Sequence, residues 1–256
     1  MISLRGLFIA ACVTGLMGVA EASTVKLTAE DGTRLTAERE GSGASGVVLV
    51  HGDGGSSADW KSLVGRLASN GYSVLAVDLR GHGGSKPPDS PADDDYLVME
   101  KDVNAAVVWL KKNGSENITV IGASLGANVA LAASASNDAI DSVVMISPTL
   151  SAKGVKASAA IGALGNRSLM LVASDAETLQ AKAVQLLSAK AQGPNHAELL
   201  SAAGSGTRLL NTAPELEGLL FAWLNGSLLT NATGSRTVQS DDVSDIQTTG
   251  KKLEDR

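Results

Sequence analysis

The sequence predicts a single α/β domain built on a mostly parallel, doubly wound sheet. Short, continuous apolar runs carry this prediction, because strands buried on both faces of a parallel sheet lack the polar alternation of half-exposed strands. Five such runs occur at residues 47–50, 74–77, 118–121, 143–146 and 169–172. Segments with helical periodicity separate these runs, which indicates helices on both faces of the sheet.

A β-hairpin is expected before the first parallel strand. Residues 25–29 and 34–38 flank Asp31-Gly32, a strong signal for a two-residue turn. A short final strand is expected at 198–202, where the chain is polar at both ends of the run. The sheet is therefore expected to open with an N-terminal hairpin and to end in a short strand.

The helical segments keep their apolar side chains on one face, which predicts packing against the sheet. One such face consists of Tyr96, Met99, Val103, Val107 and Leu110. A second face, late in the domain, consists of Leu216, Leu219, Leu220 and Trp223. Thr212 and Glu215 have the spacing of a capping box, and Pro214 is tolerated in a first turn, so the last helix is expected to begin there.

The first 22 residues have the features of a secretory signal peptide. Arg5 precedes an apolar run at 6–20, and the residues AEA at 20–22 match the small-x-small cleavage pattern. We therefore predict a secreted or periplasmic protein that is cleaved near Ala22 and begins at Ser23. One alternative is a membrane anchor, although the run is shorter than the ~20 residues of a spanning helix. Another is a lipid anchor on Cys12.

The remaining chain is expected to form one domain at 23–225 and a flexible tail at 226–256. The C-terminal segment is polar and of mixed charge, with almost no apolar periodicity. Only about 20 residues separate the strands expected at 143–146 and 169–172, which are too few for a separate cap domain. An open pocket is therefore expected.

Composition excludes several classes of function. The net charge of −6 and an aromatic content of 3% provide neither a basic patch nor stacking surfaces for nucleic acid. Cys12 is the only cysteine and lies in the expected signal peptide, so the mature protein has no thiol for a disulfide or a nucleophile. No His and carboxylate cluster has the spacing of metal ligands, so neither a metal nor a cofactor is expected. These features leave the oligomeric state open, and no integral membrane span is expected after signal cleavage.

The motif GASLG at 122–126 is a G-x-S-x-G match centred on Ser124. It follows the expected strand at 118–121 and precedes a helical segment at 128–135. In this strand–turn–helix setting, small flanking residues permit a strained turn that exposes the serine hydroxyl. The alternative is a glycine-rich strand end with a purely structural role.

Two further motifs follow strand ends, HGDGG at 51–55 and DLRGHGGS at 78–85. With the serine motif, they resemble the α/β-hydrolase superfamily, in particular its compact esterase-like and dienelactone-hydrolase-like members without a large cap. The resemblance covers residues 25–224. It implies an α/β-hydrolase fold and a small-molecule ester or acyl ligand.

The resemblance also implies roles for individual residues. Ser124 would be the nucleophile, and the backbone N–H groups of Leu125 and Asp53 would form the oxyanion hole. The carboxylate of Asp53 departs from the family pattern, because it would oppose a nearby oxyanion unless it points away. Asp175 would be the triad acid, since it follows the run at 169–172; its alternative role is the N-cap of the next helix.

The triad base is missing from its expected place. Family members commonly read Gly-His-Gly-Thr after the last strand, whereas this chain reads GSGT at 204–207, which puts Ser205 at the histidine position. A serine hydroxyl cannot accept the proton of Ser124 near neutral pH. His51 and His82 fit positions that hold loops, and His196 is expected before the last strand, at the opposite end of the sheet.

These observations predict an exported serine hydrolase of the carboxylesterase type whose activity is impaired by Ser205. The alternative is a non-catalytic protein that retains the fold and binds a small acyl ligand or a protein partner. The retained elbow at Ser124 favours the first reading, and Ser205 favours the second.

Overall fold

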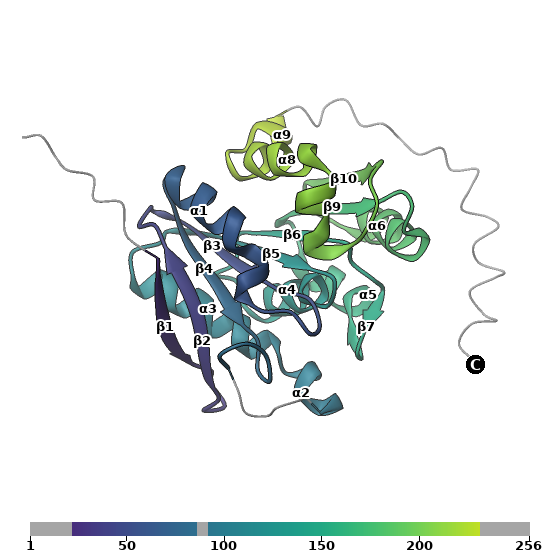
Figure 1. The fold of residues 1–256 in the computed structure, drawn as a ribbon. Coiled ribbons are helices and arrows are strands. Elements are labelled where there is room, and N and C mark those ends of the chain that lie inside the picture. The colour runs from purple at the N-terminus through teal and green to yellow at the C-terminus, as the bar shows by residue number, and fades with distance from the viewer. Residues whose placement is uncertain (1–21, 86–91, 231–256) are drawn as a thin grey trace, which may run out of the picture.

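The computed structural model describes residues 22–85 and 92–230, in which an eight-stranded sheet runs through the middle of the molecule (Figure 1). Its strands are β1 (Ser23–Thr28), β2 (Arg34–Glu40), β3 (Ser45–Val50), β4 (Tyr72–Asp78), β5 (Asn117–Ala123), β6 (Ser142–Ile146), β9 (Ser168–Ser174) and β10 (Asn195–Leu200). Their order is β1-β2-β4-β3-β5-β6-β9-β10. The pairs β1–β2 and β2–β4 are antiparallel, and all the other pairs are parallel.

The predicted strands are confirmed, and the bounds of one strand differ from expectation. Each of the five apolar runs lies inside a parallel strand, and β1 and β2 form the expected hairpin around Asp31-Gly32. The last strand, β10, covers Asn195–Leu200 instead of 198–202. Because β10 pairs only with β9, at the edge of the sheet, backbone hydrogen bonds define its polar start at Asn195 and His196. Its polar residues gave no strand signal.

Helices cover both faces of the sheet. They are α1 (Lys61–Ser69), α2 (Asp93–Leu97), α3 (Glu100–Lys112), α4 (Leu125–Ser136), α5 (Ala157–Ala160), α6 (Thr178–Lys190), α7 (Leu209–Thr212), α8 (Pro214–Leu224) and α9 (Ser227–Thr230), with 3-10 turns η1 (Ser57–Trp60), η2 (Ile161–Leu164) and η3 (Gly206–Arg208). The core on one face packs against α3, α4 and α6, and the core on the other against α1 and α8. Along β3, Val48 and Val50 join the first core, whereas Val47 and Leu49 join the second. This alternation explains why the strand is apolar throughout.

The predicted helix faces pack into the cores, with Leu219 only partly buried, but two helix boundaries differ from expectation. The face from Tyr96 to Leu110 is split between α2 and α3. The capping box expected from Thr212 does not form, because Thr212 ends α7 and its hydroxyl donates to the Arg208 carbonyl at 3.2 Å. Helix α8 begins at Pro214, and Ala213 at its N-cap supplies no side-chain acceptor.

The connection from β6 to β9 contains no cap domain, as predicted. It holds a small hairpin of β7 (Ser151–Ala152) and β8 (Val155–Lys156), followed by α5 and η2. The start of the tail expected from residue 226 differs from expectation, because Ser227–Thr230 form α9 and Leu228 packs against the core. The rest of that tail, and the signal peptide expected at 1–22 apart from its last residue, lie outside the described residues. Among the helices of the described ranges, none is long and apolar enough to cross a membrane.

Candidate active site

Ser124 occupies a sharp turn between β5 and α4. Its φ of 52° lies in the left-handed region, which non-glycine residues adopt at a cost of order 1–3 kcal/mol. A Cβ on Gly122 would collide with the Gly126 carbonyl, and a Cβ on Gly126 would collide with the Val50 carbonyl. The two glycines of the motif therefore allow α4 to approach the strands closely enough to hold the strained turn. The Ser124 amide donates to the Ile146 carbonyl at 2.9 Å.

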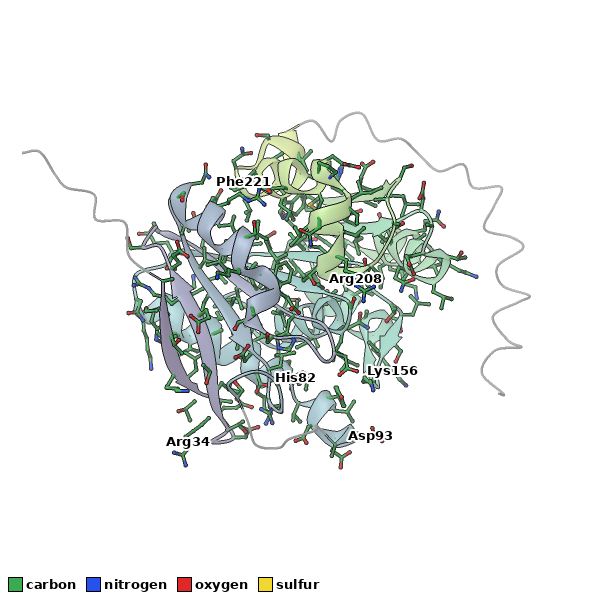
Figure 2. The ribbon with its side chains drawn as sticks, viewed as in Figure 1. Arg34, His82, Asp93, Lys156, Arg208 and Phe221 are labelled. Carbon is green, nitrogen blue, oxygen red and sulfur yellow. The ribbon has the colours of Figure 1, made fainter. Side chains whose placement is uncertain are left out.

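Ser124 lines a cleft of about 740 Å³ at the carboxyl ends of the parallel strands. Loops after four strands contribute to its wall, namely residues 52–55, 124–125, 147–153 and 205–208. Figure 2 labels Arg208, which lines the cleft, and His82, which supports the loop at 52–55. In open α/β sheets, ligands bind outside the carboxyl ends of the strands, so this cleft is the candidate active site.

Two backbone amides next to Ser124 are available as oxyanion donors. Leu125 is the first residue of α4, so its N–H has no acceptor within the helix. A Cβ on Gly52 would lie 3.4 Å from the Ser124 Cβ, which places the residue preceding Asp53 against the nucleophile. Within the described part of the chain, no backbone acceptor binds the Asp53 amide. The structure therefore leaves both amides predicted from the sequence open to a ligand.

The Asp53 side chain is held by residues from two other segments. The Tyr96 hydroxyl donates to its carboxylate at 3.0 Å, and the Lys153 ammonium lies 3.3 Å away. Lys153 stands at the tip of the β7–β8 hairpin with a φ of 49° and lies 5.3 Å from the centre of the Tyr96 ring. Burial opposes the effect, but these partners lower the pKa of Asp53. We call Asp53, Tyr96 and Lys153 the latch; it gives the Asp53 charge a cationic partner in the lining of the cleft.

His51 and His82 hold the loops around the cleft rather than acting on Ser124. His51 lies between the Gly52 carbonyl, at 2.7 Å from Nδ1, and the Leu79 amide, which donates to Nε2 at 3.1 Å. Burial lowers the pKa of His51, which favours the neutral ring. The Gly54 amide donates to His82 Nε2 at 3.2 Å. Both rings are committed to backbone groups, as the motif positions predicted.

His196 is far from the cleft. It is the second residue of β10, opposite Met170 of β9, rather than a residue before the strand as expected. It remains at the amino end of the sheet, whereas Ser124 follows the carboxyl end of β5. Its Nε2 lies 3.4 Å from a Glu198 oxygen without the geometry of a hydrogen bond.

Asp175 follows β9 but is not among the residues that line the cleft. The Ser201 hydroxyl donates to it at 2.8 Å, and Asp175 is exposed. The alternative helix N-cap role is wrong, because α6 begins at Thr178 with Glu177 as its N-cap. The predicted acid therefore lies in the expected loop, bound to a serine of the neighbouring loop.

Ser205 lines the same cleft as Ser124. The next residue, Gly206, has a φ of 62°, and a Cβ there would lie 2.7 Å from the Ser124 Oγ. The Gly206 amide donates to the Ser147 hydroxyl at 2.9 Å, which ties this loop to the end of β6. Among the described residues, no side chain accepts a hydrogen bond from the Ser124 hydroxyl.

Three residues of this site were not anticipated from the sequence. Ser147 anchors the 205–208 loop, and Tyr96 and Lys153 complete the latch. Lys153-Gly154 has the character of a hairpin turn, and Ser147 directly follows an apolar strand, so both had a local signal. Tyr96 had none, because it fits the apolar face of its helix.

A serine on a strained strand-to-helix turn, beside two open amides at the carboxyl edge of a mostly parallel sheet, defines an α/β hydrolase. The chain belongs to the alpha/beta hydrolase fold family, whose sequence model matches residues 47–228.

Curated relatives share the sequence over part of their length. An acetyltransferase component of the acetoin cleaving system of Cupriavidus necator is 33% identical over 46% of this chain and 30% of its own. Epoxide hydrolase A of Mycobacterium tuberculosis is 35% identical over 42% of this chain and 33% of its own. The matches thus span about a third of the length of these relatives.

Solved esterase structures show the same fold. An esterase of Pyrococcus furiosus is 24% identical with a TM-score of 0.67, over 80% of this chain and 90% of that one. An esterase of Exiguobacterium antarcticum is 17% identical with a TM-score of 0.61, over 78% of this chain and 99% of that one. At these identities, the similarity establishes the fold and not the substrate.

Proposed function

We propose that the protein is an exported serine hydrolase of small esters that forms an acyl-enzyme on Ser124 and turns over slowly. The observation that carries this proposal is the strained Ser124 elbow, which faces the cleft beside the open Leu125 and Asp53 amides. A strained turn of this kind persists where the surrounding structure enforces it, and such turns cluster at functional sites.

The reaction would proceed in two steps. The Ser124 oxygen attacks the ester carbonyl, the amides of Leu125 and Asp53 stabilise the oxyanion, and the alcohol leaves with a proton. Water then attacks the acyl-enzyme, releases the acid and returns the hydrogen to Ser124. Without a histidine, solvent water must carry these protons. The latch assists by pairing the Asp53 carboxylate with Lys153, which limits repulsion of the oxyanion.

The missing base sets the rate. Removal of the histidine from a serine protease triad lowers kcat by ~10⁶, and a residual ~10³–10⁴ over water comes from the oxyanion hole and binding. We therefore expect wild-type turnover to lie about 10⁶ below that of an intact triad and at most ~10³–10⁴ above the uncatalysed reaction.

The variant Ser205→His tests this proposal. An imidazole at position 205 enters the cleft of Ser124, and we expect hydrolysis of p-nitrophenyl acetate to rise by about 10² or more. The matched control is Ser124→Ala/Ser205→His, which has the same imidazole and no nucleophile. The double variant Ser201→Ala/Ser205→His releases the Asp175 carboxylate from its present partner and should be faster still. A folded Ser205→His variant with control-level activity would contradict the proposed roles.

Export is tested separately from catalysis. We expect the full-length protein expressed in a Gram-negative bacterium to accumulate in the periplasm with Ser23 at its N-terminus, because cleavage follows Ala22. N-terminal sequencing of the periplasmic and membrane fractions measures this. An intact N-terminus in the cytoplasm, or lipidation at Cys12, would contradict it.

A non-catalytic binding role is the second candidate function. It is favoured by the absence of any described base at Ser124 and by the Asp175 carboxylate, which binds Ser201. Labelling of the wild-type protein with a fluorophosphonate, with Ser124→Ala as control, separates the two. Labelling at Ser124 supports the hydrolase, whereas an unlabelled protein that binds acyl ligands supports the binding role.

A further inference from the structure

The cleft above Ser124 has a polar lining. Among the described residues that line it, only Ala123, Leu125 and Ala152 have apolar side chains, and none is aromatic. Ala123 and Leu125 are 1% and 3% exposed, so they offer a ligand little apolar surface. Small-molecule sites are ordinarily lined by apolar and aromatic side chains with few polar groups. The ligand of this cleft must therefore be recognised mainly through polar contacts.

Several polar side chains that line the cleft have no hydrogen-bonding or ion-pair partner among the described residues. Within the described residues, the side chains of Ser151, Gln180, Ser205, Thr207 and Arg208 make no hydrogen bond or ion pair. They come from the β7–β8 hairpin, from α6 and from the loop before α7. Together they present hydroxyl, amide and guanidinium groups to one volume, which suits a ligand with many oxygens.

The cleft is lined by two cationic side chains, Lys153 and Arg208, which differ in their ion pairing. Lys153 is paired with Asp53 at 3.3 Å, whereas Arg208 is exposed and has no acidic partner in the described chain. Asp59, the second acid of the lining, accepts the Ser56 amide at 3.3 Å. Arg208 is therefore the cation available to a ligand oxygen or carboxylate.

We propose that the cleft binds a small, hydroxyl-rich acyl compound, a sugar ester or sugar acid, in preference to long-chain or aromatic esters. This inference rests on the proposed function, because it names the ligand class of the same site. Leu150 and Leu179, which are 38% and 75% exposed, adjoin lining residues in the chain but do not line the cleft. They therefore provide no acyl-chain wall within it.

The test compares gluconate with hexanoate, which both have six carbons and one carboxylate and differ in their hydroxyl groups. Binding to the wild-type protein is measured by NMR titration of the amides, a readout that requires no catalysis. We expect gluconate to bind at least about tenfold more tightly, because several hydroxyl contacts each contribute a modest gain. An apolar cleft would instead favour hexanoate, by about fourfold for each methylene buried.

Variants locate the site and separate charge from hydroxyl recognition. Arg208→Gln should weaken gluconate at least about fivefold and should weaken glucose less, since only gluconate carries a charge. The matched control is Arg34→Gln, an exposed arginine of the β1–β2 hairpin that does not line the cleft and is labelled in Figure 2. It should change neither affinity.

Hexanoate binding as tightly as gluconate, or neither ligand binding, would overturn the proposed ligand class. An inactive Ser205→His variant with intact gluconate binding would instead overturn the hydrolase and leave the ligand class supported. The two failures are therefore distinguishable.

Discussion

Replacing Gly206 with alanine tests whether the 205–208 loop packs against the nucleophile as the structure shows. Gly206 has a φ of 62°, where an alanine costs about 1 kcal/mol. Its new Cβ would lie 2.7 Å from the Ser124 Oγ, so the hydroxyl must leave its rotamer at a further cost of about 1 kcal/mol. We therefore expect Gly206→Ala to lower the free energy of unfolding by about 2 kcal/mol.

Urea denaturation of four proteins measures this: wild type, Gly206→Ala, Ser124→Ala and the double variant. In the Ser124→Ala background only the backbone cost remains, so Gly206→Ala should cost about 1 kcal/mol, which leaves a coupling free energy of about 1 kcal/mol. Gly165→Ala is the control, because Gly165 has a φ of 63° and an added Cβ would meet nothing within 4 Å. An equal cost of Gly206→Ala in both backgrounds would refute the contact between the 205–208 loop and the nucleophile.

The latch and the N-terminal hairpin give two further predictions. Lys153→Gln leaves the Asp53 carboxylate without its cation, so fluorophosphonate labelling in the Ser205→His background should slow by about fivefold. Lys153→Arg should restore it, and unchanged labelling in Lys153→Gln would argue against an electrostatic role. Burial opposes the shift, but hydrogen bonds with Thr33 and the contact with Arg80 lower the pKa of Asp31 to about 2. A carboxylate whose pKa is lower in the folded than in the unfolded protein stabilises the fold at pH values above the unfolded-state pKa. Asp31→Asn should therefore lower the free energy of unfolding by about 1 kcal/mol at pH 7, allowing for exposure, and by progressively less below about pH 4. Urea denaturation at pH 7 and pH 3 checks this, and equal costs would contradict it.

The candidate site was only partly predictable from the sequence. The motif around Ser124 fixed the elbow, because a strained turn between a strand and a helix requires small residues such as Gly122 and Gly126 at its flanks. The position of Ser205 followed from the family pattern and from the loop after the last strand. The direction of the Asp175 carboxylate did not follow, because its partner Ser201 lies on a neighbouring loop 26 residues away.

The same contrast holds for the fold. Continuous apolar runs predicted the inner strands, since a strand covered on both faces must be apolar throughout. The edge strand β10 begins with Asn195 and His196, and pairing with β9 alone defines it. A sequence pattern reports burial, so it located the end of this strand, where Leu200 is buried, but not its polar start, which depends on backbone hydrogen bonds.

The sequence by itself determined the inner strands and the nucleophile elbow, because each depends on local burial or on local backbone geometry. Only the tertiary structure decided the latch, in which Asp53 meets Tyr96, 43 residues later, and Lys153. The sheet brings the ends of separate parallel strands to one edge, and loops that follow those ends choose partners there by three-dimensional proximity. No local pattern encodes that choice.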